Sequence, residues 1–299
     1  PEHLHQANKR GVKVAIINAR LSDRSFRRLG NLRKYFAWVI RRVHLILAAT
    51  KQDAERYIAL GANPELVSVT GNLKFDAQAA SPMSPEEKQS LLASLGWNSN
   101  HRILLGSSTW AGEETMLLKI FSEIKAEFPD LRLLLTPRHA ERGNEVEEVV
   151  KKSGLSYSRR SKGVAATDNL VTLADTTGEL ARLTQLAEVV TVGKSFLPHS
   201  EGQSPVDAAA SGKPIFFGPG MTNFAAIAAG LVHAQGAAWA AGEKDLKEQL
   251  LSLLRDSSLI KSRGECSKKF FEQNKGAAKR TLEWLELSQT QNQNARTAL

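Results

Sequence analysis

The chain has 299 residues, of which 42% are hydrophobic, and its formal net charge is +9 at pH 7. This length predicts two domains with ordinary cores. The single cysteine, Cys266, excludes an internal disulfide and suits a reducing compartment. The sequence contains no run of about 18 apolar residues, which is the length that would predict a membrane span. The spacing of its histidines and cysteines does not match a zinc site.

The first part of the chain, residues 1–76, alternates strands and helices. Three strands are fewer than a complete Rossmann-like domain has, so we expect the C-terminal part of such a domain, on the acceptor side. The start at Pro1 rather than Met agrees with that expectation. The expected elements are strands at 12–17, 45–48 and 67–70 and helices at 25–42 and 51–60.

Residues 77–100 interrupt this alternation with Pro82, Pro85 and a short helix, and we expect an interdomain connection there. A second series over 101–287 predicts a nucleotide-sugar-binding Rossmann-like domain with closing helices, followed by a polar tail at 288–299. The expected elements are strands at 103–106, 131–136, 170–173, 189–192 and 215–217, and helices at 112–127, 141–152, 179–187 and from Ser204-Pro205.

Basic residues are concentrated between Arg20 and Arg42, where eight Arg and Lys face one acid, Asp23. On a helix, an apolar stripe that includes Phe26 and Phe36 lies opposite a basic face. This pattern is explained either by a basic helix face that is exposed to solvent or by binding to an anionic surface. Because no nucleic-acid-binding motif accompanies the charge, we expect acidic lipid headgroups and no nucleic acid.

The segment 188–224 combines a strand, a polar loop, a short helix and a second strand. This order predicts half of a doubly wound sheet, with the loop at the carboxyl end of a strand, where such sheets bind ligands. Ser204, Pro205 and Asp207 suit the N-cap, N1 and N3 positions of the short helix, and capping alone would explain them. Alternatively, the helix start, which includes Val206, binds phosphate and Asp207 binds ribose hydroxyls.

Two further loops follow expected strands. Pro137 and Arg138 place a guanidinium at the carboxyl end of a strand, where it can bind phosphate or remain a surface arginine. The segment Asp175–Leu180 predicts a helix start whose free amides attract anions. Thr177, Gly178 and Glu179 are candidates there, and simple N-capping by Thr176 or Thr177 is the alternative.

Four residues of the first domain are further candidates. Lys74 follows a short strand and would face the cleft, where an ammonium can stabilise developing negative charge. A solvated lysine is the alternative. Asn18, Arg20 and Ser22 follow the first expected strand, where we expect contacts with an acceptor substrate.

The motifs of this chain resemble, in order, those of bacterial 3-deoxy-D-manno-octulosonic acid (Kdo) transferases. The resemblance implies an α/β fold of GT-B type with two Rossmann-like domains, the first incomplete in this chain. It further implies inverting transfer of Kdo from CMP-Kdo to a lipid A precursor in lipopolysaccharide synthesis, with no metal and no cofactor besides the donor. The motifs are NARLSDRS (18–25), TGNLKFD (70–76), GSSTWAGEE (106–114), TPRHAER (136–142), DTTGEL (175–180), GQSPVDAAASGKPIFFGP (202–219) and Asn223-Phe224.

The resemblance also implies roles for individual residues. Lys74 would stabilise the transition state, and a general base would lie upstream of Pro1, so the isolated chain is expected to bind CMP without transferring Kdo. The expected location is the cytoplasmic face of the bacterial inner membrane, peripheral or anchored through a missing N-terminal segment. The implied CMP contacts are Pro137, Arg138, Thr177, Gly178, Glu179, Ser204, Pro205, Val206 and Asp207.

Two residues depart from the family pattern. Asp207 stands where the family has Glu, so the same ribose contact needs a helix shift or a bridging water, and Trp110 stands where the family has His. The alternatives that remain open are another GT-B transferase, a sugar-nucleotide epimerase, and a non-catalytic nucleotide-binding remnant.

Overall fold

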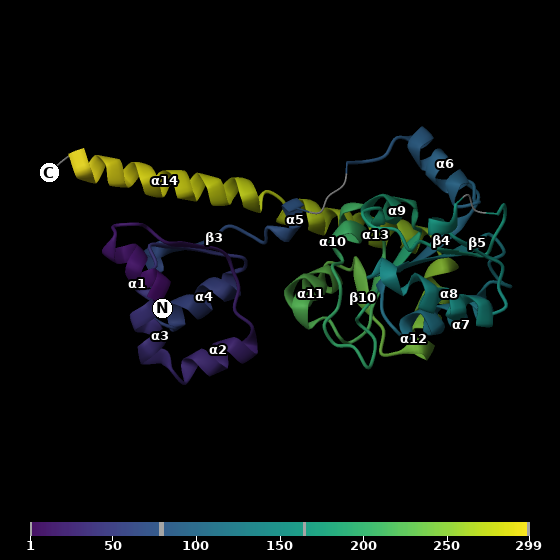
Figure 1. Ribbon diagram of the computed structural model, residues 1–299, viewed down its shortest axis with the longest axis horizontal. Coiled ribbons are helices and arrows are strands. Elements are labelled where there is room, and N and C mark those ends of the chain that lie inside the picture. Colours follow the sequence, from purple (N-terminus) through teal and green to yellow (C-terminus); the bar gives the residue numbers. More distant parts are fainter. Residues whose placement is uncertain (1, 78–80, 164–165, 298–299) are drawn as a thin grey trace. The chain divides into compact units, whose positions relative to one another are not determined.

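The computed structural model describes residues 2–77, 81–163 and 166–297, which form two compact units (Figure 1). The first unit contains residues 1–77 and 274–299, and the second contains residues 78–273. We expected the closing helices up to residue 287 in the second domain, followed by a polar tail. Instead, the last helix, α14 (Ala277–Thr297), belongs to the first unit and includes most of that tail.

Hydrogen bonds to one carboxylate explain how the chain returns to the first unit. The backbone N–H groups of Gly276 and Ala278 each donate to the Asp76 carboxylate at 2.6 Å. The Arg280 guanidinium donates to the Thr70 carbonyl at 2.8 Å. The start of helix α14 therefore contacts α5 (Lys74–Ala77), the single helical turn that ends the first segment of this unit.

The first unit is built on three parallel strands in the order β1 (Ala15–Ala19), β2 (Leu45–Ala48) and β3 (Val67–Val69). The remaining helical elements are α1 (Glu2–Lys9), α2 (Asp23–Gly30), α3 (Arg33–Ile40), α4 (Lys51–Ala59) and the 3-10 turn η1 (Pro64–Leu66). Its core packs Ile40, Ile46, Tyr57 and Leu60 together. The expected strands are thus present, although β1 begins three residues later than expected.

The basic helix expected over 25–42 is two helices, α2 and α3. The N–H of Asn31 donates to the Arg27 and Leu29 carbonyls, which caps α2. Glycine, here Gly30, is a weak helix former and favours such an end. Because of the break, Leu32 is 57% exposed instead of joining the apolar stripe, whereas Phe26 and Phe36 pack against the core.

The second unit contains a seven-stranded parallel sheet, as the α/β expectation required. The strands β6 and β10 were not expected from the sequence, because three-residue edge strands carry little periodic signal. In spatial order the strands are β10 (Ala237–Trp239), β9 (Ile215–Phe217), β8 (Val189–Val192), β4 (Arg102–Thr109), β5 (Leu131–Pro137), β7 (Val171–Leu173) and β6 (Tyr157–Arg159).

The helices of this unit complete a doubly wound arrangement. Helices α8 and α12 pack on α7, while α9 contacts both α10 and β4. The chain proceeds from β4 toward β5 and returns across the sheet to β8, so the topological switch point lies between β4 and β8. The helices are α6 (Pro85–Ser94), α7 (Glu113–Ile124), α8 (Gly143–Lys152), α9 (Leu180–Leu186), α10 (Val206–Ala210), α11 (Ala225–His233), α12 (Glu243–Leu254) and α13 (Ser257–Asn274), with 3-10 turns η2 (Ala140–Arg142), η3 (Arg160–Lys162) and η4 (Thr222–Phe224).

The segment expected to connect the domains contains α6, which begins with a capping box between Ser84 and Glu87 and contacts α9. Among the helices of the described ranges, none has both the length and the apolar character needed to cross a bilayer.

Candidate functional site

A small crevice opens at the carboxyl ends of β5 and β7 in the second unit. Its volume is about 120 Å³, and Pro137, Arg138, Thr177 and Gly178 contribute to its lining. The structure thus brings together two loops that are about 40 residues apart in sequence and that were expected to bind CMP. Parallel strands end at the same edge of a sheet, which explains why these loops meet.

Arg138 is the cationic group of this crevice. Its backbone N–H donates to the Thr109 carbonyl at 3.1 Å, which fixes the loop against β4. The side chain is exposed, and within the described residues its guanidinium has no hydrogen-bond or ion-pair partner. Gly178 has a φ of +83° and open space where a Cβ would stand, so a ligand can approach its backbone.

Glu179 lies at the same loop, but its carboxylate is bound within the protein. Arg160 holds it through Nε at 2.7 Å and Nη2 at 2.6 Å, and the Thr176 hydroxyl also donates to it. The hydrogen bond from Arg160 lowers the pKa of Glu179. Helix α9 begins at Leu180, later than the predicted start at residue 179, and Glu179 is its N-cap residue. Glu179 therefore fixes the loop.

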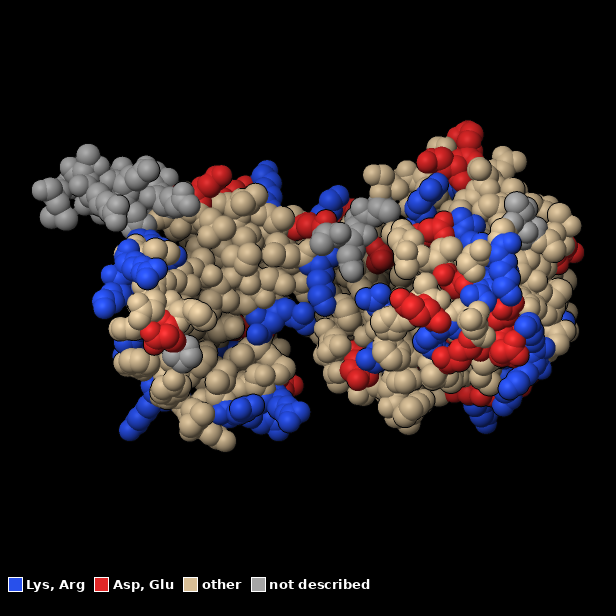
Figure 2. Space-filling view, in the orientation of Figure 1, with Lys and Arg blue, Asp and Glu red and all other residues tan. Residues whose placement is uncertain are grey.

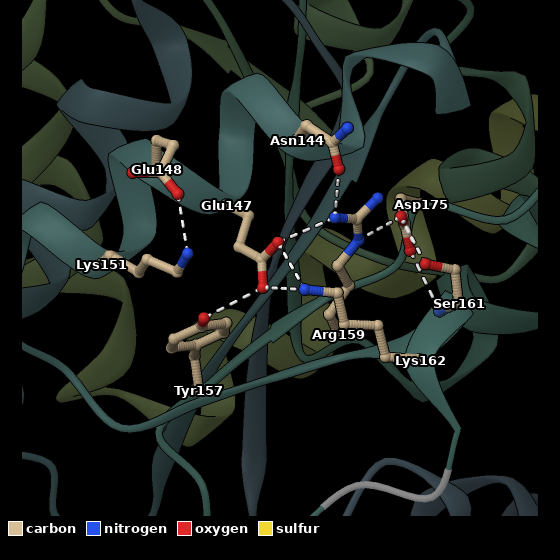
Figure 3. A network of polar contacts seen from close by, with 9 residues as sticks. All are labelled: Asn144, Glu147, Glu148, Lys151, Tyr157, Arg159, Ser161, Lys162 and Asp175. Carbon is tan, nitrogen blue, oxygen red and sulfur yellow. Dashed lines mark hydrogen bonds and ion pairs between the residues drawn. The ribbon is translucent and has the colours of Figure 1, made fainter.

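A network of charged residues holds Asp175, which directly precedes this loop (Figure 3). Asp175, at the end of β7, accepts hydrogen bonds from Arg159 Nε at 2.6 Å and from the Ser161 hydroxyl at 2.7 Å. Arg159 also donates to Glu147 at 2.8 Å, and Lys162 donates to both oxygens of Glu147 at 2.7 and 2.8 Å. Helix α8, β6 and η3 are thus tied to the residue that precedes the crevice loop.

The expected Ser204–Asp207 site lies at the start of α10 and is not part of the crevice lining. Pro205 is the N-cap residue, one position later than expected, and the Ser204 hydroxyl accepts a long bond from the Val206 N–H at 3.4 Å. Pro205 and Val206 are both buried.

Asp207 is the residue of α10 with unmet polar capacity. Its Oδ1 is buried and has no hydrogen-bond partner among the described residues. Burial raises the pKa of Asp207 to about 6. A desolvated carboxylate without a donor costs stability, and donors from a ligand, such as hydroxyl groups, would offset that cost.

Sequence reasoning missed Glu113, which holds the loop after β8. Its carboxylate accepts from the backbone N–H groups of Trp110 (2.9 Å), Lys194 (2.8 Å), Ser195 (2.9 Å) and Phe196 (3.2 Å). Burial raises the pKa of Glu113, and these four donors act in the opposite direction. Glu113 does lie in the motif GSSTWAGEE (106–114), but an acid in the first turn of a helix favours the helix dipole and gives no hint of the loop after β8.

In the first unit, the candidates at the carboxyl edge of the small sheet do come together. Asn18 Oδ1 accepts from the Leu73 N–H at 3.2 Å, which joins the end of β1 to the loop after β3. Burial, followed by the nearby charge of Arg20, lowers the pKa of Lys74. Gly71 permits this arrangement, since its φ is +97° and an added Cβ would lie 2.8 Å from Arg280 Nη2.

Ser22 and Asp53 organise the same edge. The Ser22 hydroxyl accepts from the Ser25 N–H at 3.2 Å as the N-cap of α2, which is a structural role. Asp53 accepts from the Leu21 N–H at 2.7 Å, and Arg56 pairs with Asp23. Asp53 was also missed, although Thr50 three residues earlier signals the cap of α4.

Over the part of the chain that the structure describes, no group of three His, Cys, Asp or Glu residues lies close enough to hold a metal ion. Basic side chains gather over α2 in Figure 2, whereas acidic and basic side chains are mixed over the second unit.

Comparisons with known proteins identify the family. A family model described as 3-deoxy-D-manno-octulosonic-acid transferase (kdotransferase) matches residues 1–77. The chain is 32% identical to the 3-deoxy-D-manno-octulosonic acid transferase of Haemophilus influenzae over 288 residues, and 30% identical to that of Bordetella pertussis over 291 residues. Each match covers 96% of this chain and 66% of the relative.

Solved structures give the same result for the fold. The C-terminal CMP-Kdo binding domain of WaaA from Acinetobacter baumannii is 25% identical with a TM-score of 0.56, covering 61% of this chain and 95% of that domain. A UDP-N-acetylglucosamine 2-epimerase from Listeria monocytogenes, described as putative in its own name, covers 94% of this chain and 71% of its own at a TM-score of 0.60, with 14% identity. The second likeness concerns the fold alone.

Proposed function

The chain belongs to the family of 3-deoxy-D-manno-octulosonic acid transferases, and we propose that it supplies the CMP-Kdo-binding part of an enzyme that transfers Kdo to a lipid A precursor. The transfer would invert the anomeric centre and serve lipopolysaccharide synthesis. The observation that carries the proposal is the crevice that an exposed Arg138 lines together with the Thr177-Gly178 loop.

In this proposal each group has a chemical task. Arg138 binds the phosphate of CMP and offsets the charge that develops as CMP leaves. The backbone at Thr177 and Gly178 approaches the nucleotide closely, while Glu179 and Asp175 keep that loop in place. Asp207 accepts hydrogen bonds from the ribose, directly or through water because its side chain is short.

The first unit would position the acceptor. Lys74 and Arg20 provide positive charge at the carboxyl edge of its sheet, and Asn18 joins the loops that carry them. Three carboxylates on the helices of this unit are engaged: Asp23 of α2 pairs with Arg56, Asp53 of α4 holds the Leu21 amide, and Asp76 of α5 holds α14. These engagements support the proposal that the general base comes from sequence outside this chain.

We further propose that the protein works at the cytoplasmic face of a bacterial inner membrane. Its acceptor would be a lipid, and α2 and α3 present basic side chains beside exposed Leu32, Tyr35 and Trp38. Such a surface suits anionic lipid headgroups.

Calorimetric titration with CMP tests the proposal. Arg138→Ala should weaken CMP binding by about 1.5–3 kcal/mol, the range for a charge-assisted hydrogen bond. Arg182→Ala is the matched control, because Arg182 is an exposed arginine on α9 outside the crevice lining, and it should change the affinity little. Equal CMP affinity for both variants would remove Arg138 from the site, and a preference for UDP over CMP would favour the epimerase alternative.

A further inference from the structure

The loops after β4 and β8 meet at the topological switch point of the second unit, on the other side of β4 from the Arg138 crevice. Gly193 allows the approach, because an added Cβ would lie 2.2 Å from the Ser108 carbonyl oxygen. The next residue, Lys194, has a φ of +56°, and Ser108 has a φ of +54°. Two non-glycine residues therefore adopt the left-handed conformation side by side, which is a costly arrangement that concentrates at functional sites.

The backbone of Lys194 is held on both sides. Its N–H donates to Glu113 at 2.8 Å, and its carbonyl accepts from the Gly202 N–H at 2.7 Å. These two hydrogen bonds hold Lys194 in its strained backbone conformation. Glycine would adopt this φ without strain, so the lysine side chain itself is the feature that needs an explanation.

The side chain of Lys194 lies over an aromatic cluster. Its ammonium is 4.1 Å from the centroid of the Trp110 ring, a cation–π geometry that fixes the charge without neutralising it. Trp110 in turn contacts His139 edge-on at 5.4 Å and His199 at 5.7 Å between ring centroids. His139 directly follows Arg138, so this cluster continues from the crevice that would hold the nucleotide.

One carboxylate competes for the same ammonium. Glu201 lies 3.6 Å from Lys194, and its side chain is 44% exposed, whereas that of Lys194 is 21% exposed. An anion that enters from solvent can displace Glu201, because a solvated surface pair contributes little stability.

We propose that Lys194, fixed over Trp110, binds the carboxylate of the sugar acid that the nucleotide carries. This inference rests on the proposed function, since it needs a CMP-linked sugar acid in the neighbouring crevice. Such a donor has two anionic groups, and a positive charge on each side of β4 gives each group its own partner: Arg138 binds the phosphate and Lys194 binds the carboxylate. Trp110 is a positioning residue, because it acts by holding the ammonium.

The test compares CMP with CMP-Kdo in calorimetric titrations of the full chain. The protein should bind CMP-Kdo more tightly than CMP. Lys194→Met should lower the affinity for CMP-Kdo about tenfold, the loss expected for one charge-assisted contact, and change the affinity for CMP less than twofold. Lys194→Gly should show the same selective loss while its thermal stability rises, because glycine relieves the left-handed conformation.

Two controls separate this inference from its alternatives. Glu201→Gln removes the competing carboxylate and should raise the affinity for CMP-Kdo. Trp110→Phe should keep part of the discrimination that Trp110→Ala loses. A Lys194→Met variant that binds both ligands as the unchanged protein does would overturn the proposal, and equal losses for CMP and CMP-Kdo would assign Lys194 to the phosphate. Absence of CMP binding by the unchanged protein would instead refute the proposed function.

Discussion

At the scale of single residues, Asp207 combines a functional expectation with a stability cost. Its carboxylate is largely buried, and its Oδ1 has no donor among the residues that the structure describes. The capping chemistry expected from the sequence gave no warning of this cost, because a cap acid is normally satisfied by the first amides of its own helix.

The substitution Asp207→Asn should therefore stabilise the protein while it weakens CMP binding. A raised pKa means that the protonated form is favoured in the folded state, so stability falls as the pH rises from the ordinary value of 3.8 toward about 6. That difference corresponds to about 3 kcal/mol above pH 6. Urea unfolding at pH 7.5 should show a gain of this order for the variant, and the gain should shrink at pH 5.

Glu248→Gln is the control for Asp207→Asn. Glu248 is an exposed acid that lies 3.9 Å from Lys244, and such surface pairs contribute little. Its unfolding free energy should change by less than about 0.5 kcal/mol at both pH values. An Asp207→Asn variant with the same stability as the unchanged protein at pH 7.5 would mean that the carboxylate is satisfied in solution.

At the scale of secondary-structure elements, the network in Figure 3 holds α8, β6 and η3 together. Glu147 is its central acceptor and is only 5% exposed. The hydrogen bond from Lys162 is the main reason that its pKa is lowered to about 2. Because the ordinary pKa is 4.5, its stabilising effect is complete above pH 4.5 and is lost as the pH falls toward 2.

Glu147→Gln should consequently destabilise the protein by about 3–5 kcal/mol at pH 7, the cost of removing one partner from a buried ion pair. Chemical unfolding measures this loss, and the difference from the unchanged protein should diminish below pH 4.5. Glu148→Gln, on the same helix but with its side chain 61% exposed, should cost less than about 1 kcal/mol. Similar losses for the two variants would contradict a central role for Glu147.

The helices α2 and α3 form a second element-scale feature, a surface with basic side chains and exposed aromatics. Tyr35 and Trp38 are 56% and 51% exposed, and the Arg42 guanidinium lies 3.7 Å from the centroid of the Trp38 ring. The chain should therefore co-sediment with vesicles containing phosphatidylserine more than with neutral vesicles. Added salt should reduce the difference, since exposed charges are screened beyond about 10 Å at 0.1 M.

A double variant tests this surface directly. Each basic residue near an anionic membrane contributes about 1 kcal/mol, so Arg27→Gln with Arg28→Gln should weaken vesicle binding by about 2 kcal/mol. Lys51→Gln, a matched exposed cation on α4, should have a smaller effect. Equal binding of the unchanged protein to neutral and anionic vesicles would leave α2 and α3 as helices with a solvated basic face.

At the scale of the whole molecule, we predict that these 299 residues bind CMP but do not transfer Kdo. General-base assistance is worth about 10²–10⁴ in rate, and positioning of the acceptor adds to that. The measurement is an assay with CMP-Kdo and a lipid A precursor, in which this chain is compared with one extended by the upstream coding sequence. The extended chain should be the more active by at least that factor.

Comparable turnover by the two chains would place the base within the 299 residues. The control is CMP binding, which should be equal for both chains because the crevice lies entirely in the second unit.

The sequence by itself determined the type and order of most elements. The runs Val189–Val192 and Ile215–Phe217 became β8 and β9 with the expected boundaries, because short β-branched or aromatic runs between polar loops have one stable state in a buried parallel sheet. Collinear motifs also determined the family. Element boundaries and family motifs both depend on residues that are adjacent in the sequence, so neither required knowledge of tertiary contacts.

Tertiary structure alone decided which partners these elements found. Nothing local to α14 specifies that Asp76 receives its first amides, and nothing local to Glu179 specifies that Arg160 binds its carboxylate. The same holds for Lys194, whose left-handed backbone depends on Glu113, 81 positions earlier. The local sequence determines which polar groups need a hydrogen-bond partner. The tertiary fold determines which distant residue comes within hydrogen-bonding distance of each group, and these long-range contacts form the crevice.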